Sequence, residues 1–254
     1  MSDRLIQSVA RSLDILEQFS FTQTELSVKE ISEGVKLSKS TVHGLIKTLS
    51  QRGYLEQNQE NQKYKLGLRL FELGNVVAGN MEIRQIAAPI IAQLGETLQE
   101  TVHLVIRDGN QAVYVEKRDG PGSIRMYSQY GKRAPLHCTG VGKAILAFLP
   151  EKVMEQILIE SEMVAFTPKT LTDPEKIKEE LSITRDRGYA IDDEEIELGL
   201  TCIAAPIFNH KKEVIASISC AGLKFRYLEE SQEMRPQQVI QAAKEISRRL
   251  GWKE

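Results

Sequence analysis

A histidine and three cysteines are the residues of this chain whose types suit catalysis or metal binding. His137 and Cys138 are adjacent, and Cys202 and Cys220 follow at wide intervals. Structural zinc sites take ligands in closely spaced pairs, and these intervals match no such pattern. Adjacent residues on a strand point to opposite faces, which disfavours a Cys–His catalytic pair. We therefore expect reduced thiols, buried or lining a pocket, and no catalytic residue, metal or cofactor.

Two further motifs have the residue types to bind a phosphate or a cation. The segment 139–143, Thr-Gly-Val-Gly-Lys, resembles part of a phosphate-binding loop. However, His137 stands where such a loop needs its first glycine, and Ala144 replaces the Ser or Thr that follows the lysine. Residues 192–195 are four consecutive acids, a run that is more often a solvated loop than a cation site. Neither motif predicts an enzyme.

The elements that precede these residues point to nucleic acid. Ser27 and Glu30 have the spacing of a capping box, which predicts a helix ending near Gly34. Ser38 is then a good N-cap for a second helix, which we expect to run to about Arg52. Two short helices joined by a sharp turn suit insertion of the second helix into the DNA major groove.

The second helix is basic on its outer face only. Its apolar residues recur with helical spacing on the other face, and no acid occurs between Glu33 and Glu56. An ordinary amphipathic helix with a solvated basic face would look similar. The following segment favours the DNA-binding interpretation, because residues 53–56 and 63–66 read as two strands around a polar turn. The whole pattern predicts a winged helix-turn-helix.

The predicted DNA contacts fall into two groups. Side chains on the outer face of the second helix are expected to read base edges, and its first residues and the wing are expected to contact phosphates. The base-reading group is Ser40, Thr41, His43, Gly44 and Lys47, and the phosphate group is Ser38, Lys39, Lys63 and Tyr64.

The whole-chain properties limit this interpretation to a local basic patch. The chain has 254 residues, enough for two domains, and a formal net charge of −2. Residues 1–79 carry ten basic and nine acidic side chains, so the DNA-binding part has no general positive field. No apolar run approaches a membrane span, and no signal peptide is evident at the N-terminus. These features favour a cytoplasmic protein.

Helices and strands alternate irregularly in the remainder of the chain. The pattern predicts an α+β, sensor-like domain rather than a doubly wound one. A first helix from Asp3 to about Ser20 carries more apolar surface than a small domain needs, which suggests contact with a second subunit. The predicted elements after the wing are a linker helix over 67–82, helices over 82–100, 139–149, 173–187 and 236–250, and strands over 102–107, 111–116, 202–208 and 214–221. Pro89 fits better near a helix start than in its middle.

Short motifs along the whole chain resemble those of the isocitrate-lyase-regulator (IclR) family of transcription regulators. The resemblance implies an N-terminal winged helix that binds operator DNA and a C-terminal GAF-like domain that binds a small effector. It also implies dimers, often paired into tetramers, and most commonly repression. One departure is Gly44, where the family usually has arginine, so the operator sequence cannot be taken from relatives. The matching stretches are 8–13, 37–43, 52–55, 64–67, 131–137, 142–147, 187–190, 195–199 and 202–206.

The resemblance also implies an effector site in the C-terminal domain. In it, Asp192 would accept a hydrogen bond from a ligand hydroxyl and Ser219 would donate one to a carboxylate. Free N–H groups and two glycines at the start of the 139–149 helix would favour an organic acid, although the glycines could instead serve tight packing. The implied effector-binding residues are Gly140, Val141, Asp192, Leu200, Cys202 and Ser219.

The sequence therefore predicts three parts. Residues 1–66 form a winged helix-turn-helix domain, 67–82 a linker helix, and 83–254 a GAF-like α/β domain. The predicted function is transcription regulation, most often repression, through binding to double-stranded operator DNA. A small carboxylate is expected to control this binding. The expected assembly is a homodimer or a dimer of dimers, and no membrane contact is expected. The alternative is a cysteine-dependent hydrolase or metal-binding sensor on the C-terminal domain with a DNA-binding appendage.

Overall fold

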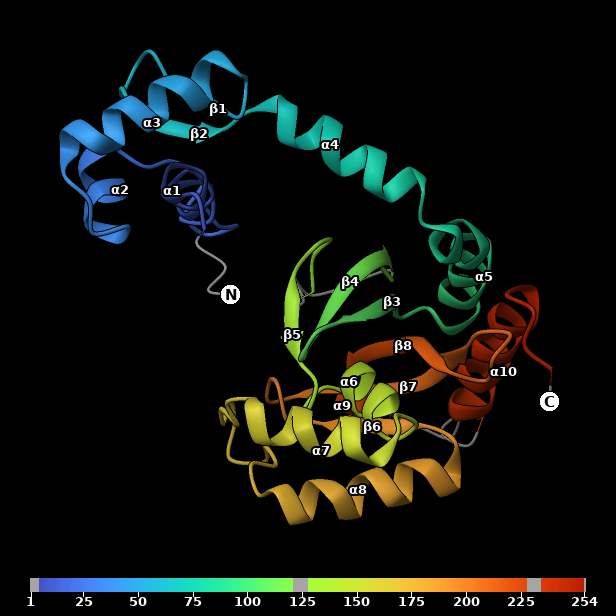
Figure 1. The fold of residues 1–254 in the computed structure, drawn as a ribbon. Coiled ribbons are helices and arrows are strands. Elements are labelled where there is room, and N and C mark those ends of the chain that lie inside the picture. Colours follow the sequence, from blue (N-terminus) through green and yellow to red (C-terminus); the bar gives the residue numbers. More distant parts are fainter. Residues whose placement is uncertain (1–4, 121–127, 228–233, 254) are drawn as a thin grey trace. The chain divides into compact units, whose positions relative to one another are not determined.

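The computed structural model describes residues 5–120, 128–227 and 234–253. The chain divides into two compact units, Met1–Asn80 and Met81–Glu254. Each unit has its own hydrophobic core. The helices and strands of the chain are labelled in Figure 1.

The N-terminal unit is a three-helix cluster with a two-stranded wing. The capping box predicted at Ser27 and Glu30 is present, and the Ser38 side chain accepts the Thr41 N–H at the start of the next helix. Apolar residues from all three helices and the wing form one core around Ile15, Ile31 and Ile46. The elements are α1 (Gln7–Leu16), α2 (Val28–Gly34), α3 (Lys39–Gln51), β1 (Leu55–Gln57), β2 (Tyr64–Leu66) and α4 (Leu68–Gly79).

The first helix is shorter than the sequence predicts. It ends at Leu16 rather than near Ser20, because Ser20 bonds locally to Thr22 and Gln23 and Phe19 turns into the core. At its other end, Ile6 provides no side-chain cap, and residues 1–4 lie outside the described part of the chain. The helix α4 falls within the predicted linker segment and has no buried residue.

The C-terminal unit is built on one antiparallel sheet of six strands in the order β5-β4-β3-β8-β7-β6 (Figure 1). Its register places Cys202 of β7 opposite Asp192 of β6 and Ser219 of β8 opposite His103 of β3. The four neighbouring strands β3, β8, β7 and β6 therefore bring several polar side chains together. The strands are β3 (Thr101–Asp108), β4 (Gln111–Arg118), β5 (Arg133–Pro135), β6 (Ala190–Asp193), β7 (Leu200–Phe208) and β8 (Val214–Leu223).

Helices cover both faces of this sheet. One face packs against α5 and α10 around Ile91, Ile218 and Val239, and the other packs against α6, α7 and α8 around Ile145, Ile157 and Ile177. Strand alternation therefore aims every second residue of β7 at α6. The helices are α5 (Glu82–Leu98), α6 (Gly140–Leu146), α7 (Glu151–Glu160), α8 (Pro174–Arg187), α9 (Lys224–Tyr227) and α10 (Met234–Arg249).

The α+β class is confirmed, with corrections in detail. Pro89 lies inside α5 rather than near its start, in a segment whose Ala87, Ile90 and Ile91 are buried against the sheet. The helix begun by Thr139 ends at Leu146 rather than Leu149. The sequence prediction also missed β5, β6 and α7.

Candidate functional site

The outer face of α3 is open to solvent. All five predicted base-reading residues, Ser40, Thr41, His43, Gly44 and Lys47, are exposed. The opposite face is closed, because Val42, Ile46 and Leu49 are buried in the core of the N-terminal unit. The structure thus brings the five residues together on one side of one helix. A Cβ added at Gly44 would meet no atom within 4 Å, so nothing inside the protein requires glycine there.

The predicted phosphate contacts are less uniform. Ser38 and Lys39 are exposed at the start of α3, where the Ser38 hydroxyl also contacts the side-chain oxygens of Ser40 and Thr41. Lys63 is half-buried, and its Nζ lies 3.5 Å from a Glu30 oxygen. Tyr64 is only 9% exposed and packs in the core, so the prediction of a surface contact for its ring needs correction.

A cavity of about 60 Å³ lies in the C-terminal unit between the N-terminal end of α6, the sheet and the loop from β6 to β7. This volume is small beside ordinary ligand pockets, which measure roughly 300–1,000 Å³. The six predicted effector residues, Gly140, Val141, Asp192, Leu200, Cys202 and Ser219, all line it. Eight other residues complete the lining: His103, Tyr114, Ser128, Thr139, Ile196, Glu197, Thr201 and Ala221.

The two glycines of α6 do different things. A Cβ at Gly142 would lie 2.3 Å from the carbonyl oxygen of Leu136, and Gly142 does not line the cavity, so it serves packing alone. A Cβ at Gly140 would lie 3.0 Å from the Sγ of Cys202, on the cavity wall. Thr139 already caps the Gly142 N–H, at 3.0 Å. The expectation that both glycines admit a ligand is therefore wrong for Gly142.

A neutral histidine stands at the floor of the cavity. His103 is 3% exposed, and its Nδ1 and Nε2 lie 3.2 Å and 2.6 Å from the hydroxyl oxygens of Ser219 and Ser128. Burial, reinforced by the nearby positive charge of Lys117, lowers the pKa of His103 to about 3. The ring therefore carries no charge near neutral pH. The sequence analysis placed His103 only in a strand, although a lone polar residue within an apolar strand was a usable signal.

The described lining contains two carboxyl side chains, those of Asp192 and Glu197. Asp192 lies at the wall, where its Oδ1 accepts the backbone N–H of Glu195 at 2.8 Å. The surrounding protein desolvates Asp192 and raises the pKa of its carboxyl to about 7. Glu197 is the second carboxylate, and no Lys or Arg occurs in the described lining.

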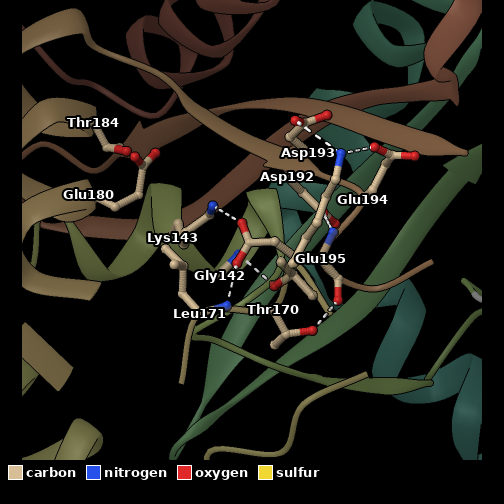
Figure 2. Close-up of polar contacts among 12 residues, drawn as sticks. Gly142, Lys143, Thr170, Leu171, Glu180, Thr184, Asp192, Asp193, Glu194 and Glu195 are labelled. Carbon is tan, nitrogen blue, oxygen red and sulfur yellow. Dashed lines mark hydrogen bonds and ion pairs between the residues drawn. The ribbon is translucent and has the colours of Figure 1, made fainter. Parts of the chain in front are cut away.

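A buried ion pair stands directly behind this wall (Figure 2). Lys143 of α6, 1% exposed, donates from Nζ to the carboxylate of Glu195, which is 5% exposed. The second oxygen of Glu195 accepts the Leu171 N–H at 3.3 Å, and the Thr170 hydroxyl donates to the Glu195 carbonyl at 2.6 Å. These contacts were not predicted, because nothing in the sequence pairs residues 143 and 195.

The thiols do not form a reactive centre. Burial raises the pKa of both Cys138 and Cys202, which keeps them as neutral thiols. Burial also lowers the pKa of His137, whose Nε2 lies 3.3 Å from the Val164 carbonyl oxygen. Within the described ranges, no group of three or more His, Cys, Asp or Glu residues is arranged to hold a metal ion.

Comparison with known families identifies both units. A model described as the IclR helix-turn-helix domain matches residues 8–59, and one described as the bacterial transcriptional regulator IclR C-terminal domain matches residues 75–248. The chain belongs to the IclR family. It is a transcriptional regulator, as the named relatives of this family are.

Three known proteins illustrate how closely this IclR-family chain follows its relatives. It is 42% identical to the HTH-type transcriptional regulator XynR of Escherichia coli K12, over 98% of both chains. The crystal structure of Thermotoga maritima IclR is 35% identical with a TM-score of 0.80, covering 98% of this chain and 100% of that one. An IclR homolog from Microbacterium hydrocarbonoxydans, solved in complex with 4-hydroxybenzoate, is 27% identical with a TM-score of 0.84, covering 96% and 98%. No helix in the described part of the chain is long and apolar enough to cross a membrane.

Proposed function

We propose that this IclR-family regulator binds a palindromic operator through α3 and is controlled by a small hydroxy acid bound in the cavity of its C-terminal unit. The observation that carries the proposal is the convergence of Gly140, Asp192, Cys202 and Ser219 on one cavity. Repression is the mode that the family resemblance implies. We expect the protein to act in the cytoplasm, where operator DNA is found, with residues 1–66 as the reading domain and 67–82 as the linker.

The exposed face of α3 supports the first half of the proposal. Thr41 and Lys47 are both exposed on it, and a lysine contact to a guanine edge is worth about 1–3 kcal/mol. We therefore expect Lys47→Ala and Thr41→Ala to weaken operator binding in a footprint titration at fixed salt. Lys211→Ala, in the exposed turn between β7 and β8, is the control for a general loss of positive charge. Unchanged affinity in both α3 variants would remove α3 from the interface.

The chemistry of the cavity supports the second half. In the proposed arrangement, Asp192 accepts a hydrogen bond from the ligand hydroxyl, Ser219 donates one to the carboxylate, and Leu200 and Cys202 form the apolar wall. The 4-hydroxybenzoate of the homolog carries both groups, a hydroxyl and a carboxylate. Because α6 has only seven residues, its dipole adds little, and the side chains must supply the selectivity.

Calorimetry tests the effector class. A panel of hydroxy acids, their analogues without hydroxyl and the matching neutral alcohols is titrated into the wild type and Gly140→Leu. A leucine at 140 would fill the cavity, because even its Cβ would lie 3.0 Å from the Cys202 Sγ. We expect hydroxy acids to bind the wild type best and Gly140→Leu to bind none. Binding of uncharged ligands alone, or equal binding by Gly140→Leu, contradicts the proposal.

Exposed apolar helix faces support assembly into dimers. Val9 and Leu13 of α1 are 54% and 52% exposed, and Phe71 and Val76 of α4 are 70% and 61% exposed. Water-exposed side chains of this size in two helices favour a second subunit, which a palindromic operator also requires. We expect the full chain to sediment as a dimer or a dimer of dimers, and Val9→Glu/Phe71→Glu to shift it towards monomer. A wild type that sediments as a monomer, with and without operator DNA, contradicts this part.

Control by the effector requires coupling between the two sites. If effector binding alters operator affinity by some factor, operator binding alters effector affinity by the same factor. Calorimetric titration of the effector in the presence and absence of operator DNA measures this factor directly. A factor of one would leave a protein that binds both ligands independently.

A further inference from the structure

We propose that Lys143 and Glu195 are positioning residues that hold Asp192 in the cavity and thereby set its preference for hydroxylated ligands. This inference rests on the proposed effector function of the cavity and extends it to two residues that do not line it. The observation behind it is a chain of contacts that joins the two opposing walls (Figure 2).

The first wall is the start of α6. Gly140 and Val141 line the cavity, and Lys143 follows on the same short helix, with its side chain directed away from solvent. This wall is fixed from behind, because the Val141 carbonyl accepts the Ser217 hydroxyl at 3.0 Å and Gly142 packs against Leu136. Lys143 therefore projects from a rigid support.

The second wall is the end of β6 and the loop that follows it. Asp192, Ile196, Glu197 and Leu200 line the cavity from this side. The one described contact between the loop and α6 through charged groups is the ion pair from Lys143 to Glu195. The backbone N–H of the same Glu195 donates to Asp192 Oδ1. The position of Glu195 therefore sets the direction of the Asp192 carboxylate.

Stability alone does not explain this pair. Burying two charges costs several kcal/mol per ion, and replacing such a pair by apolar residues is often neutral or stabilising. The neighbouring ion pairs of the loop, from Lys169 and Lys224 to Asp193 and Glu194, have side chains 15–53% exposed and already hold the loop to the rest of the unit. The buried pair instead fixes the position of Glu195, because the Lys143 ammonium on a fixed helix allows few positions for the Glu195 carboxylate.

The geometry also limits what the Lys143 charge does for a ligand. The Lys143 ammonium forms an ion pair with Glu195, and Lys143 does not line the cavity. Lys143 therefore does not bind a ligand carboxylate directly. Its charge acts on Asp192 directly, and its contact acts through Glu195 on the same carboxylate, the group proposed to accept a ligand hydroxyl. Loss of the pair should reduce discrimination for the hydroxyl more than binding of the carboxylate.

The test replaces the pair without leaving an orphaned charge. The variant Lys143→Met/Glu195→Gln is compared with Arg226→Met/Glu100→Gln. Glu100 is the control: it is 5% exposed like Glu195, does not line the cavity, and pairs with Arg226 at 3.6 Å and with Arg235 at 3.7 Å, for which the amide oxygen introduced by Glu100→Gln can still act as acceptor. Glu195→Asp keeps the negative charge but shortens the side chain. It tests the same pair if the double variant does not fold.

The first measurement needs no ligand. Hydrogen exchange of the peptide containing residues 193–199 reports the Glu195 N–H that Asp192 accepts. We expect exchange about ten-fold faster in Lys143→Met/Glu195→Gln and Glu195→Asp, and unchanged in the control. Equal exchange in all four proteins would overturn the proposal.

The second measurement uses lactate against propionate and 4-hydroxybenzoate against benzoate, titrated calorimetrically into the full-length proteins. We expect the affinity ratio for the hydroxylated acid to fall about five- to ten-fold in the cavity-side variants, the range of one misplaced hydrogen bond, and not in the control. A wild type that prefers the hydroxylated acids, with the preference intact in both variants, overturns the positioning role. A wild type that binds none of the four acids, while exchange changes as expected, refutes the proposed effector class and supports the positioning role.

Discussion

Replacing Gly44 by alanine should stabilise the N-terminal unit and weaken operator binding at the same time. Gly44 lies in the middle of α3, on its exposed face, at a position where its backbone needs no left-handed conformation. A Cβ there would meet nothing inside the protein. Since the molecule itself gives no reason for glycine, the reason must come from outside, and close approach of a DNA groove is the one that α3 suggests.

The size of both effects follows from this geometry. Glycine in a helix interior costs about 1 kcal/mol relative to alanine, and no steric strain offsets the gain here. For a unit of about 80 residues, 1 kcal/mol corresponds to roughly 4–8 °C in Tm. On the operator, a methyl group at a tightly packed contact should cost about 1 kcal/mol, or roughly five-fold in Kd.

Thermal unfolding by circular dichroism and a footprint titration at fixed salt measure the two effects on the same preparations. Gly74→Ala is the matched control, since Gly74 lies within α4 and a Cβ there also meets nothing within 4 Å. It should raise Tm similarly without changing operator affinity. If Gly44→Ala raises Tm and leaves operator affinity unchanged, DNA does not approach at Gly44 and the reasoning fails.

Three shorter predictions concern the C-terminal unit. Burial raises the pKa of Asp192 to about 7, so between about pH 4 and pH 7 unfolding releases the Asp192 proton and the contribution of Asp192 to stability declines as the pH rises. In urea unfolding, the free energy of unfolding of Asp192→Asn relative to the wild type should therefore grow from pH 5 to pH 7.5. A difference that stays constant with pH would contradict this prediction. Gly142→Ala should destabilise the unit by about 1–3 kcal/mol in thermal melts, since its Cβ would lie 2.3 Å from the Leu136 oxygen; an unchanged Tm would show that α6 can shift. Ser219→Ala should cost about 1–3 kcal/mol by leaving His103 Nδ1 without its partner, whereas Ser219→Thr, which keeps a hydroxyl, should cost less.

Local signals in the sequence were enough to predict most elements. The capping box at Ser27, the Ser38 cap and the start of the predicted helix over 173–187, where Asp173 caps the Glu175 N–H, each involve contacts within one turn, and all three begin helices in the structure. The elements that were missed depend on distant partners. The three-residue strand β5 exists because it pairs with β4, and β6 because it pairs with β7. Pro89 lies on the exposed side of α5, in a helix whose Ala87, Ile90 and Ile91 are buried against the sheet, and this tertiary packing is what no local rule predicts.

The candidate site was predictable to a different extent in its two halves. Helical periodicity placed Ser40, Thr41, His43 and Lys47 on one face, and all of them are exposed. The cavity residues came from family resemblance rather than from spacing, because strands β3, β6, β7 and β8 bring together positions more than a hundred residues apart. The prediction for Tyr64 failed because alternation in a short wing strand does not reveal which face is covered.

The charges around the cavity bear on how the proposed acid effector would bind among described lining residues that include no Lys or Arg. Lys143 is neutralised by Glu195, and His103 is held neutral by burial, so a ligand carboxylate gains no direct ion pair from the described lining. Placing it beside an ionised Asp192 would set two negative charges in one small space, which costs more than either hydrogen bond returns. A ligand carboxylate would therefore share one proton with Asp192, whose pKa of about 7 leaves its carboxyl close to half protonated at neutral pH. A protonated Asp192 can donate a hydrogen bond to the ligand as well as accept one. Selectivity in the proposed site therefore depends on the protonation of Asp192 and on the Lys143–Glu195 ion pair that orients the Asp192 carboxyl.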